Sequence, residues 1–175
     1  MKKARPILPV DEWRPMRRAD LAAVVRISDA VHGALTEGRA IYEERLALYP
    51  AGCGVLERGG IAAGYLVSHP WHRHAPPPLN QLLGGIPADA DTFYLHDIAL
   101  LPSQRGTGAG RAALELVARQ ALAAGFADIT LIAVNGADRY WAARGFAYAE
   151  AETSPSYGQG AFLMHRPVTG LTAPG

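Results

Sequence analysis

The chain has 175 residues, of which 49% are hydrophobic and 19% charged, a balance typical of one globular domain with a packed core. The net charge of +1 gives no general attraction to nucleic acid or to an acidic membrane, and no apolar run approaches the roughly 18 residues of a membrane span. The single cysteine, Cys53, excludes an internal disulfide, and the interrupted apolar stretch after Met1 does not resemble a signal peptide, so we expect a cytoplasmic protein.

The hydrophobic pattern predicts alternating strands and helices. The N-terminal half is predicted to form a strand over 13–16, a helix after Asp20, a helix over 39–49, and strands over 54–57 and 61–68. The C-terminal half is predicted to form a strand over 92–101, a helix over 112–124, a strand over 128–134, a helix over 138–144, strands over 146–149 and 161–166, and a loose tail over 167–175. This order predicts a single domain of the α/β (α+β) class over 1–175, with its core over about 13–167.

Residues 70–91, PWHRHAPPPLNQLLGGIPADAD, interrupt this pattern with five prolines and a Gly-Gly pair. Such a long excursion in a compact domain is often functional, so we expect it to shape the acceptor side of a cleft through Trp71, the prolines and the histidines. Residues 153–158 could face the same cleft. His69, His72 and His74 fit no strong zinc spacing and have no cysteine nearby, so no metal is predicted.

The segment Gln104-Arg105-Gly106-Thr107-Gly108-Ala109-Gly110-Arg111 joins a predicted strand to a predicted helix. Glycines let a ligand approach the main chain, and a helix start offers free amides and a partial positive charge to a phosphate. The Walker A ending Gly-Lys-Ser/Thr is missing, and the dinucleotide fingerprint fails at Arg111 and Ala113. What remains is Arg-x-x-Gly-x-Gly, or else a glycine-rich turn that only starts a helix.

A second motif follows in Tyr140-Trp141-Ala142-Ala143-Arg144-Gly145-Phe146, after an apolar strand that ends at Val134-Asn135. Together with the glycine segment, residues 93–147 resemble the GNAT superfamily of N-acetyltransferases, and the predicted element order extends the resemblance over about 13–167. The resemblance implies a mixed central sheet of about seven strands flanked by about four helices. It also implies acetyl-CoA as cosubstrate and a primary amine, of a small molecule or of a protein, as acceptor.

The resemblance implies that backbone amides of the glycine segment hold the coenzyme A pyrophosphate. It further implies that the preceding strand pairs with the pantetheine arm and that Asn135 lies near it, while Trp141 packs on the cofactor or in the core. The implied cofactor residues are Ile98, Ala99, Leu100, Arg105, Gly106, Thr107, Gly108, Ala109, Gly110, Arg111, Asn135 and Trp141. Leu100 N–H would stabilise the oxyanion.

Acetyl transfer to an amine needs a base that removes a proton from the amine. Side chains alternate along a strand, so Tyr94, His96 and Ile98 are expected on one face, with Asp97 on the other. His96 is the preferred base because histidine titrates near neutral pH, and Tyr94 shares its face. Asp97 is the second candidate, since a bulge could turn it inward. Each could instead be a purely structural side chain.

The acid for the leaving thiolate is less defined. The family often has a tyrosine four residues before the Gly-Phe glycine, where this chain has Trp141. Tyr140 or Tyr157 could replace it, although Tyr140 should point about 100° away from Trp141 on a helix, or solvent could protonate the thiolate. Because of this departure, a non-catalytic acyl-CoA-binding sensor remains an alternative to the enzyme. A third alternative is an unrelated phosphate-binding domain. The fold is also compatible with a homodimer through an edge strand.

Overall fold

The computed structural model describes residues 12–150, 153 and 155–168. Within these residues, seven strands form one mixed sheet in the order β1-β2-β3-β4-β5-β7-β6. The strands are β1 (Glu12–Pro15), β2 (Cys53–Arg58), β3 (Ile61–Trp71), β4 (Thr92–Leu100), β5 (Asp128–Ala133), β6 (Ala147–Tyr148) and β7 (Phe162–Pro167). The predicted fold class is therefore confirmed. The tail expected over 167–175 is wrong at its start, because Pro167 ends β7 and Val168 is buried in the core. Residues 169–175 of that tail, Ser154 of the expected cleft loop, and residues 1–11 lie outside the described residues.

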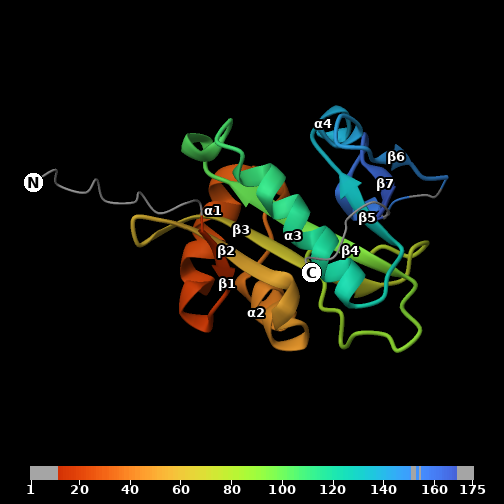
Figure 1. The fold of residues 1–175 in the computed structure, drawn as a ribbon, viewed down its shortest axis with the longest axis horizontal. Helices are drawn as coiled ribbons and strands as arrows, with labels where there is room; N and C mark the ends of the chain where they lie inside the picture. Colours follow the sequence, from red (N-terminus) through yellow and green to blue (C-terminus); the bar gives the residue numbers. More distant parts are fainter. Residues whose placement is uncertain (1–11, 151–152, 154, 169–175) are drawn as a thin grey trace, which may run out of the picture.

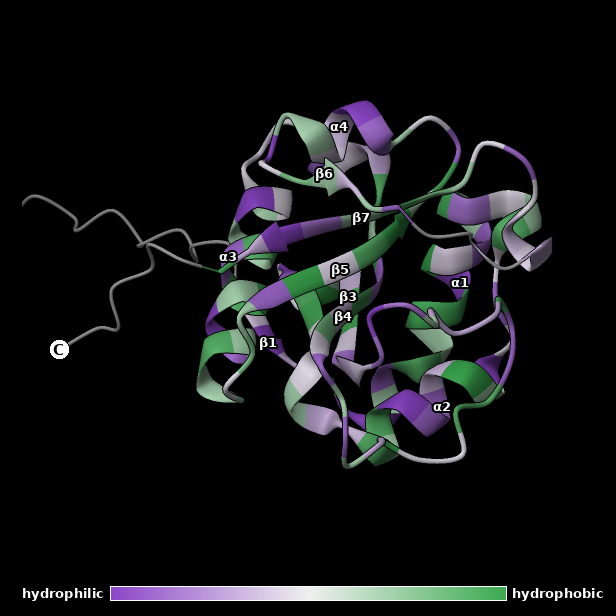
Figure 2. Ribbon diagram, turned by 90° about the vertical axis from the view of Figure 1, so that its right-hand side faces the viewer, coloured by the Kyte–Doolittle hydropathy of each residue, from purple (hydrophilic) through white to green (hydrophobic). Residues whose placement is uncertain are grey.

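Helices cover both faces of the sheet (Figure 1). The helices are α1 (Leu21–His32), α2 (Arg39–Leu48), α3 (Ala109–Ala123) and α4 (Asp138–Ala142). On α1 the buried stripe Leu21, Val24 and Ile27 faces the sheet beside α2, with Tyr65 and Val67 of β3. We call this side the α1/α2 face. The opposite side carries α3 and the core built around Phe93 and the mostly apolar β5, which is largely green in Figure 2.

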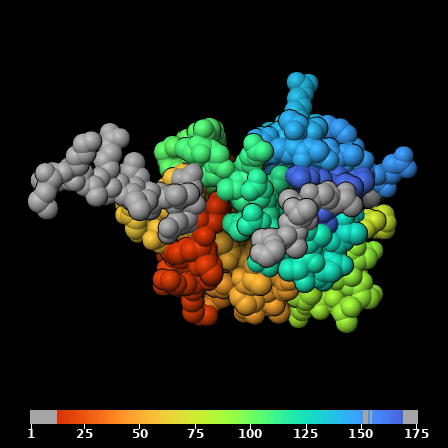
Figure 3. Space-filling view, viewed as in Figure 1, coloured from red at the N-terminus to blue at the C-terminus, as the bar shows by residue number. Residues whose placement is uncertain are grey.

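The N-terminal and C-terminal parts of the chain meet beside α3. In Figure 3 the green-to-teal residues of α3 lie between the red and orange N-terminal segments and the blue C-terminal segments. Strands β4 and β5 run parallel and form the seam between the two parts. Their ladder includes only the pairs Phe93–Ile129 and Tyr94–Thr130, so the two strands diverge beyond these residues. The divergence opens a wedge in the middle of the sheet.

A β-bulge interrupts β4 at the same point. Val67 of β3 lies opposite Asp97 and Ser68 lies opposite Leu95, so His96 is the extra residue. Tyr94 lies opposite His69, which is two residues from Val67 and therefore on the same face of β3. The bulge thus brings Asp97 to the same α1/α2 face as Tyr94. The prediction that Asp97 faces away from Tyr94 and His96 is wrong for this reason. Ile98 packs against the opposite core, so it does not share the face of His96.

In the described part of the chain, no helix is both long enough and apolar enough to cross a membrane.

Candidate active site

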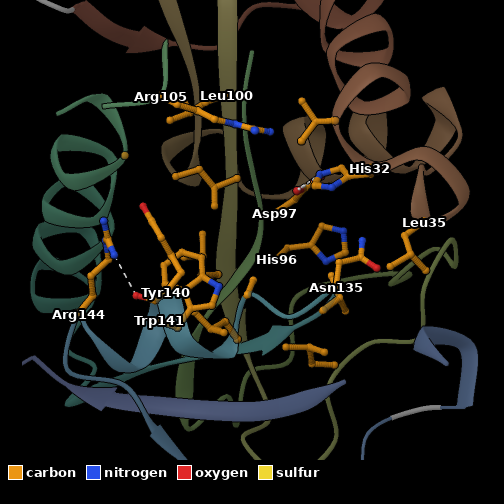
Figure 4. A pocket seen from close by; sticks show the side chains of 18 of the residues that line it. His32, Leu35, His96, Asp97, Leu100, Arg105, Asn135, Tyr140, Trp141 and Arg144 are labelled. Atoms are coloured by element: carbon orange, nitrogen blue, oxygen red, sulfur yellow. Dashed lines mark hydrogen bonds and ion pairs between the residues drawn. The ribbon is translucent and has the colours of Figure 1, made fainter. Parts of the chain in front are cut away.

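A cavity of about 630 Å³ occupies the wedge between β4 and β5 and extends beyond both of its ends (Figure 4). One end is formed by the loop before α3, the first turn of α3, and α4. The other is formed by the C-terminal end of α1, the turn η2 (Gly33–Leu35), and the turn η5 (Pro155–Tyr157). The predicted site residues that line it are Tyr94, His96, Asp97, Ile98, Leu100, Arg105, Gly106, Gly108, Gly110, Arg111, Asn135, Tyr140 and Trp141. Sequence elements far apart in the chain thus share one cavity.

Three of the predicted cofactor residues do not line the cavity with the others. Ala99 is buried in the core on the α1/α2 face, and Ala109 is buried at the start of α3. Thr107 instead organises the loop, because its hydroxyl donates to Gln104 O at 2.7 Å and accepts from Ala109 N at 3.4 Å. Any contact of Ala99 or Ala109 with a ligand would therefore be made by the main chain.

The glycine loop ends in a helix start that is open to a ligand. Gly106 and Gly108 have φ values of +74° and +87°, a backbone conformation that residues with a side chain rarely adopt. Gly108 is the N-cap of α3. The amides of the first helical turn have no partners within the helix and carry the positive end of its dipole. Arg105 and Arg111 are exposed beside them. This end of the cavity is suited to a phosphate or pyrophosphate.

The main chain of β4 presents an edge to the wedge. Leu101 N donates to Ala63 O of β3 at 2.9 Å. Because successive residues of a strand direct their N–H groups to opposite edges, Leu100 and Ile98 direct theirs toward the wedge. An extended ligand with amide groups could pair with this edge as an added strand does.

His96 forms a buried pair with Glu37, which sequence reasoning missed. His96 Nε2 donates to Glu37 Oε1 at 2.6 Å, and the two side chains are 1% and 4% exposed. Burial alone would raise the pKa of Glu37, but the charge and hydrogen bond of His96 and the amide of Asn80 together lower it. With its proton on Nε2, neutral His96 has a lone pair on Nδ1, a buried atom that has no hydrogen-bond partner in the structure. This arrangement is that of an oriented base.

Asp97 belongs to a second carboxylate–histidine pair. His32 Nε2 donates to Asp97 Oδ1 at 2.7 Å, and the hydroxyls of Tyr65 and Tyr42 donate to Oδ2 at 2.5 and 3.2 Å. Burial acts to raise the pKa of Asp97, but the hydrogen bond and charge of His32 prevail and lower it. The pKa of His32 is correspondingly raised, because the hydrogen bond and charge of Asp97 outweigh the effect of burial. Asp97 is thus held as a carboxylate and is poorly suited to accept a proton.

The two aromatic residues of α4 have different surroundings. Trp141 is 8% exposed and packs edge-on against Phe146 in the core, with part of its surface on the cavity. Tyr140 is 41% exposed and extends toward the side where Leu100 and Arg105 lie (Figure 4). Its hydroxyl is 2.8 Å from the point where a Cβ on Gly110 would stand. The two side chains therefore point in different directions from α4, as expected, and that of Tyr140 points into the cavity.

Arg144, another residue that sequence reasoning did not assign to the site, fixes the ring of Tyr140. Its guanidinium carbon lies 3.4 Å from the ring centroid, and Nη1 donates to Tyr140 O at 2.9 Å. The sequence signal that could have indicated this contact is the spacing of four residues between Tyr140 and Arg144, which places two side chains on the same side of a helical turn.

The excursion over 70–91 contributes less to the cavity than predicted. Leu79 lines it, whereas Trp71, His72 and His74 do not. Trp71 Nε1 donates to Ala75 O, and His72 pairs with Asp89. Within the described residues, no group of three or more His, Cys, Asp or Glu side chains could hold a metal ion.

Comparison with known proteins agrees with this fold. The sequence model of the acetyltransferase (GNAT) family matches residues 21–146, whereas no curated protein gives a significant match. Among solved structures, the loading GNATL domain of CurA from Lyngbya majuscula has a TM-score of 0.76 at 13% identity, covering 91% of this chain and 98% of that one. The ribosomal-protein-S18-alanine N-acetyltransferase from Escherichia coli has a TM-score of 0.66 at 17% identity, covering 93% and 97%. At these identities the likeness shows the fold.

Proposed function

Because the chain belongs to the GNAT acetyltransferase family, we propose that it transfers an acetyl group from acetyl-CoA to a primary amine by direct attack. One observation carries the proposal. A single cavity connects the anion-binding start of α3, the free edge of β4, and the buried pair of His96 and Glu37. A thioester laid along β4 would have its pyrophosphate at one end and its acyl carbon near the base.

The residues fit acetyl-CoA in chemistry as well as in order. The positive helix start and the exposed Arg105 and Arg111 suit the pyrophosphate, whose contacts would come from main-chain amides over 105–111. The amide-bearing pantetheine arm suits the edge at Ile98 and Leu100, with Asn135 lining the same region. The apolar wedge would exclude water from the thioester.

The reaction requires no covalent enzyme intermediate. The amine nitrogen attacks the thioester carbonyl, a C–N bond forms, and the carbonyl oxygen gains negative charge that Leu100 N–H can stabilise. His96 Nδ1 takes the proton that the amine loses, while Glu37 stabilises the resulting imidazolium. The C–S bond then breaks, and Tyr140 Oη donates a proton to the thiolate. Tyr140 regains its proton from solvent, to which it is exposed. The products are the N-acetyl amine and coenzyme A.

Calorimetry with acetyl-CoA, coenzyme A and NADH tests the cofactor part of this proposal. We expect binding of the first two, no binding of NADH, and loss of acetyl-CoA binding in Gly108→Glu, because a carboxylate would stand at the pyrophosphate site. Gly125→Glu is the matched control, since Gly125 also has a positive φ of +83° with open space around it but lies beyond the other end of α3. Equal acetyl-CoA affinity in the two folded variants would refute the assignment of the loop.

Release of free thiol distinguishes the enzyme from a non-catalytic acyl-CoA sensor. The enzyme releases coenzyme A from acetyl-CoA only when an acceptor amine is added. A sensor binds acetyl-CoA with the same loop and releases none with any amine.

A further inference from the structure

The charged residues of the cavity are separated by sign. Its three arginines, Arg105, Arg111 and Arg144, all lie at the end formed by the glycine loop, α3 and α4. Its two carboxylates, Glu37 and Asp97, both lie at the opposite end, each paired with a histidine. When the histidines are neutral this end, which we call the acceptor end, is negatively charged, so it attracts an ammonium ion and repels a second carboxylate.

The walls of the acceptor end are apolar. Val31, Leu35 and Leu79 line it, together with Tyr94 and Tyr157. The hydroxyl of Tyr157 is already engaged, because it donates to Pro77 O at 2.8 Å. Burial raises the pKa of this tyrosine to about 12, so it stays neutral. The body of an acceptor would therefore meet hydrocarbon and aromatic surface.

Two loops that line the acceptor end are joined to each other. Tyr157 and Ser156 of η5 contact the 70–91 excursion, through the bond to Pro77 O and through the Leu79 amide, which donates to Ser156 Oγ at 2.9 Å. The excursion is in turn fixed to Glu37, the partner of His96, because Asn80 N donates to Glu37 Oε2 at 2.8 Å. An extended peptide would have to run past these joined loops, whereas a small molecule needs only the space that they help to wall.

From these three features, and on the basis of the proposed acetyl transfer, we infer that the acceptor is a small primary monoamine with an apolar body and no carboxylate beside its amine. The carboxylates attract its ammonium form, which loses one proton to solvent before attack and the next to His96 Nδ1, and the apolar wall covers its body. An α-amino acid would place its own carboxylate near Glu37 and Asp97. A polyamine would bury a second ammonium ion against Val31, Leu35 and Leu79 without a partner, which is costly.

The test compares five acceptors under the same conditions, with thiol release as the readout. They are 2-phenylethylamine, L-phenylalaninamide, L-phenylalanine, spermidine, and a hexapeptide with a free N-terminal alanine. We expect kcat/KM for L-phenylalanine to be at least roughly 100-fold below that for 2-phenylethylamine, because the two differ by the carboxylate. L-Phenylalaninamide, which keeps the size without the charge, should recover most of the loss. A higher kcat/KM for L-phenylalanine, spermidine or the peptide would overturn the inference.

A matched pair of variants tests the apolar wall. Leu79 lines the acceptor end, whereas Leu82 in the same excursion is 61% exposed and does not. We expect Leu79→Ala to lower kcat/KM for 2-phenylethylamine roughly tenfold, with little effect on methylamine, and Leu82→Ala to change neither. Equal effects of the two variants on 2-phenylethylamine would overturn the assignment of the wall.

Binding measurements separate failure of this inference from failure of the proposed function. Calorimetry on the complex with coenzyme A should detect 2-phenylethylamine and a much weaker L-phenylalanine. If acetyl-CoA does not bind, the proposed function fails. If acetyl-CoA binds and L-phenylalanine or the peptide is acetylated best, the transferase stands and the acceptor class is wrong. If acetyl-CoA binds and neither turnover nor amine binding occurs, the acceptor end is not an amine site.

Discussion

At the scale of single residues, the proposed reaction depends on the pair of His96 and Glu37, which would remove the proton from the amine. We expect His96→Gln to lower kcat roughly 100-fold or more near neutral pH while leaving the Kd of acetyl-CoA unchanged, because the residue acts on the amine and not on the cofactor. Stopped or continuous thiol assays across pH, together with calorimetry, measure both quantities. His72→Gln is the control, since His72 is outside the cavity and pairs with Asp89. An unaltered pH–rate profile in His96→Gln would exclude His96 as the base.

The site residues that could be predicted from the sequence lie near a recognisable motif, whereas those that could not be predicted contact the site from distant parts of the chain. Tyr94, His96 and Asp97 stand on one strand beside a recognisable loop, so their presence in the cavity could be predicted from the sequence. Glu37 contacts His96 across 59 residues of sequence, and His32 contacts Asp97 across 65. A contact at such a separation leaves no local pattern. Only the packing of α1 and the following turn against β4 brings these partners together.

Tyr140 presents the second test at this scale. We expect Tyr140→Phe to lower kcat by roughly 10- to 100-fold with unchanged acetyl-CoA affinity, because the variant keeps the ring against Arg144 and loses only the hydroxyl. The control is Tyr148→Phe, in which an exposed hydroxyl that donates to Asp138 is removed outside the cavity. If Tyr140 protonates the thiolate, the variant should slow a poor thiol leaving group more than a good one, so the two rates should diverge. Full activity of Tyr140→Phe would leave protonation to solvent.

At the scale of elements, most strands and helices could be predicted because their periodicity is local. The helix α3 begins at Ala109, three residues before the predicted start at 112, because the glycines that signal a loop also form its first turn. Strict alternation along β4 predicted one set of side chains on each face. The bulge at His96 changed which of these side chains share a face. The divergence of β4 and β5 was likewise invisible in the sequence, since it depends on how two strands pair and not on either strand.

At the scale of the whole molecule, the cavity joins parts of the chain that the sequence separates. The acceptor end uses α1, η2, the 70–91 excursion and η5, whereas the opposite end, where we propose that the pyrophosphate binds, uses the loop before α3, the start of α3, and α4. The wedge between β4 and β5 lies between them. Opposite charges at the two ends match the two substrates of the proposed reaction, an anionic thioester and a cationic amine. In the proposed reaction the sheet therefore both supports the core and sets the order of the two substrates along the cavity.

The stability of the whole molecule should depend on a buried histidine beneath this cavity. Burial, together with the charge of His96, lowers the pKa of His69 from 6.5 to about 3, and its Nδ1 donates to Pro70 O at 2.9 Å. Between these pH values the unfolded chain binds a proton that the folded chain does not bind, so the free energy of unfolding decreases as the pH falls. One such group changes that free energy by up to about 1.4 kcal/mol per pH unit. This loss is confined to the acid side of pH 6.5.

His69→Gln removes the titrating group, so we expect a flatter dependence of stability on pH below 6.5, even if the variant is less stable at pH 7.5. Urea unfolding of both proteins from pH 7.5 to 4.5 measures the difference. Glu37, Asp97 and His32 remain in both proteins, so their contributions largely cancel when the two curves are subtracted. The two curves should converge as the pH falls. Parallel curves would mean that His69 is also protonated in the folded protein. Its Nε2 atom, which has no hydrogen-bond partner in the structure, would then contact an ion or a water molecule.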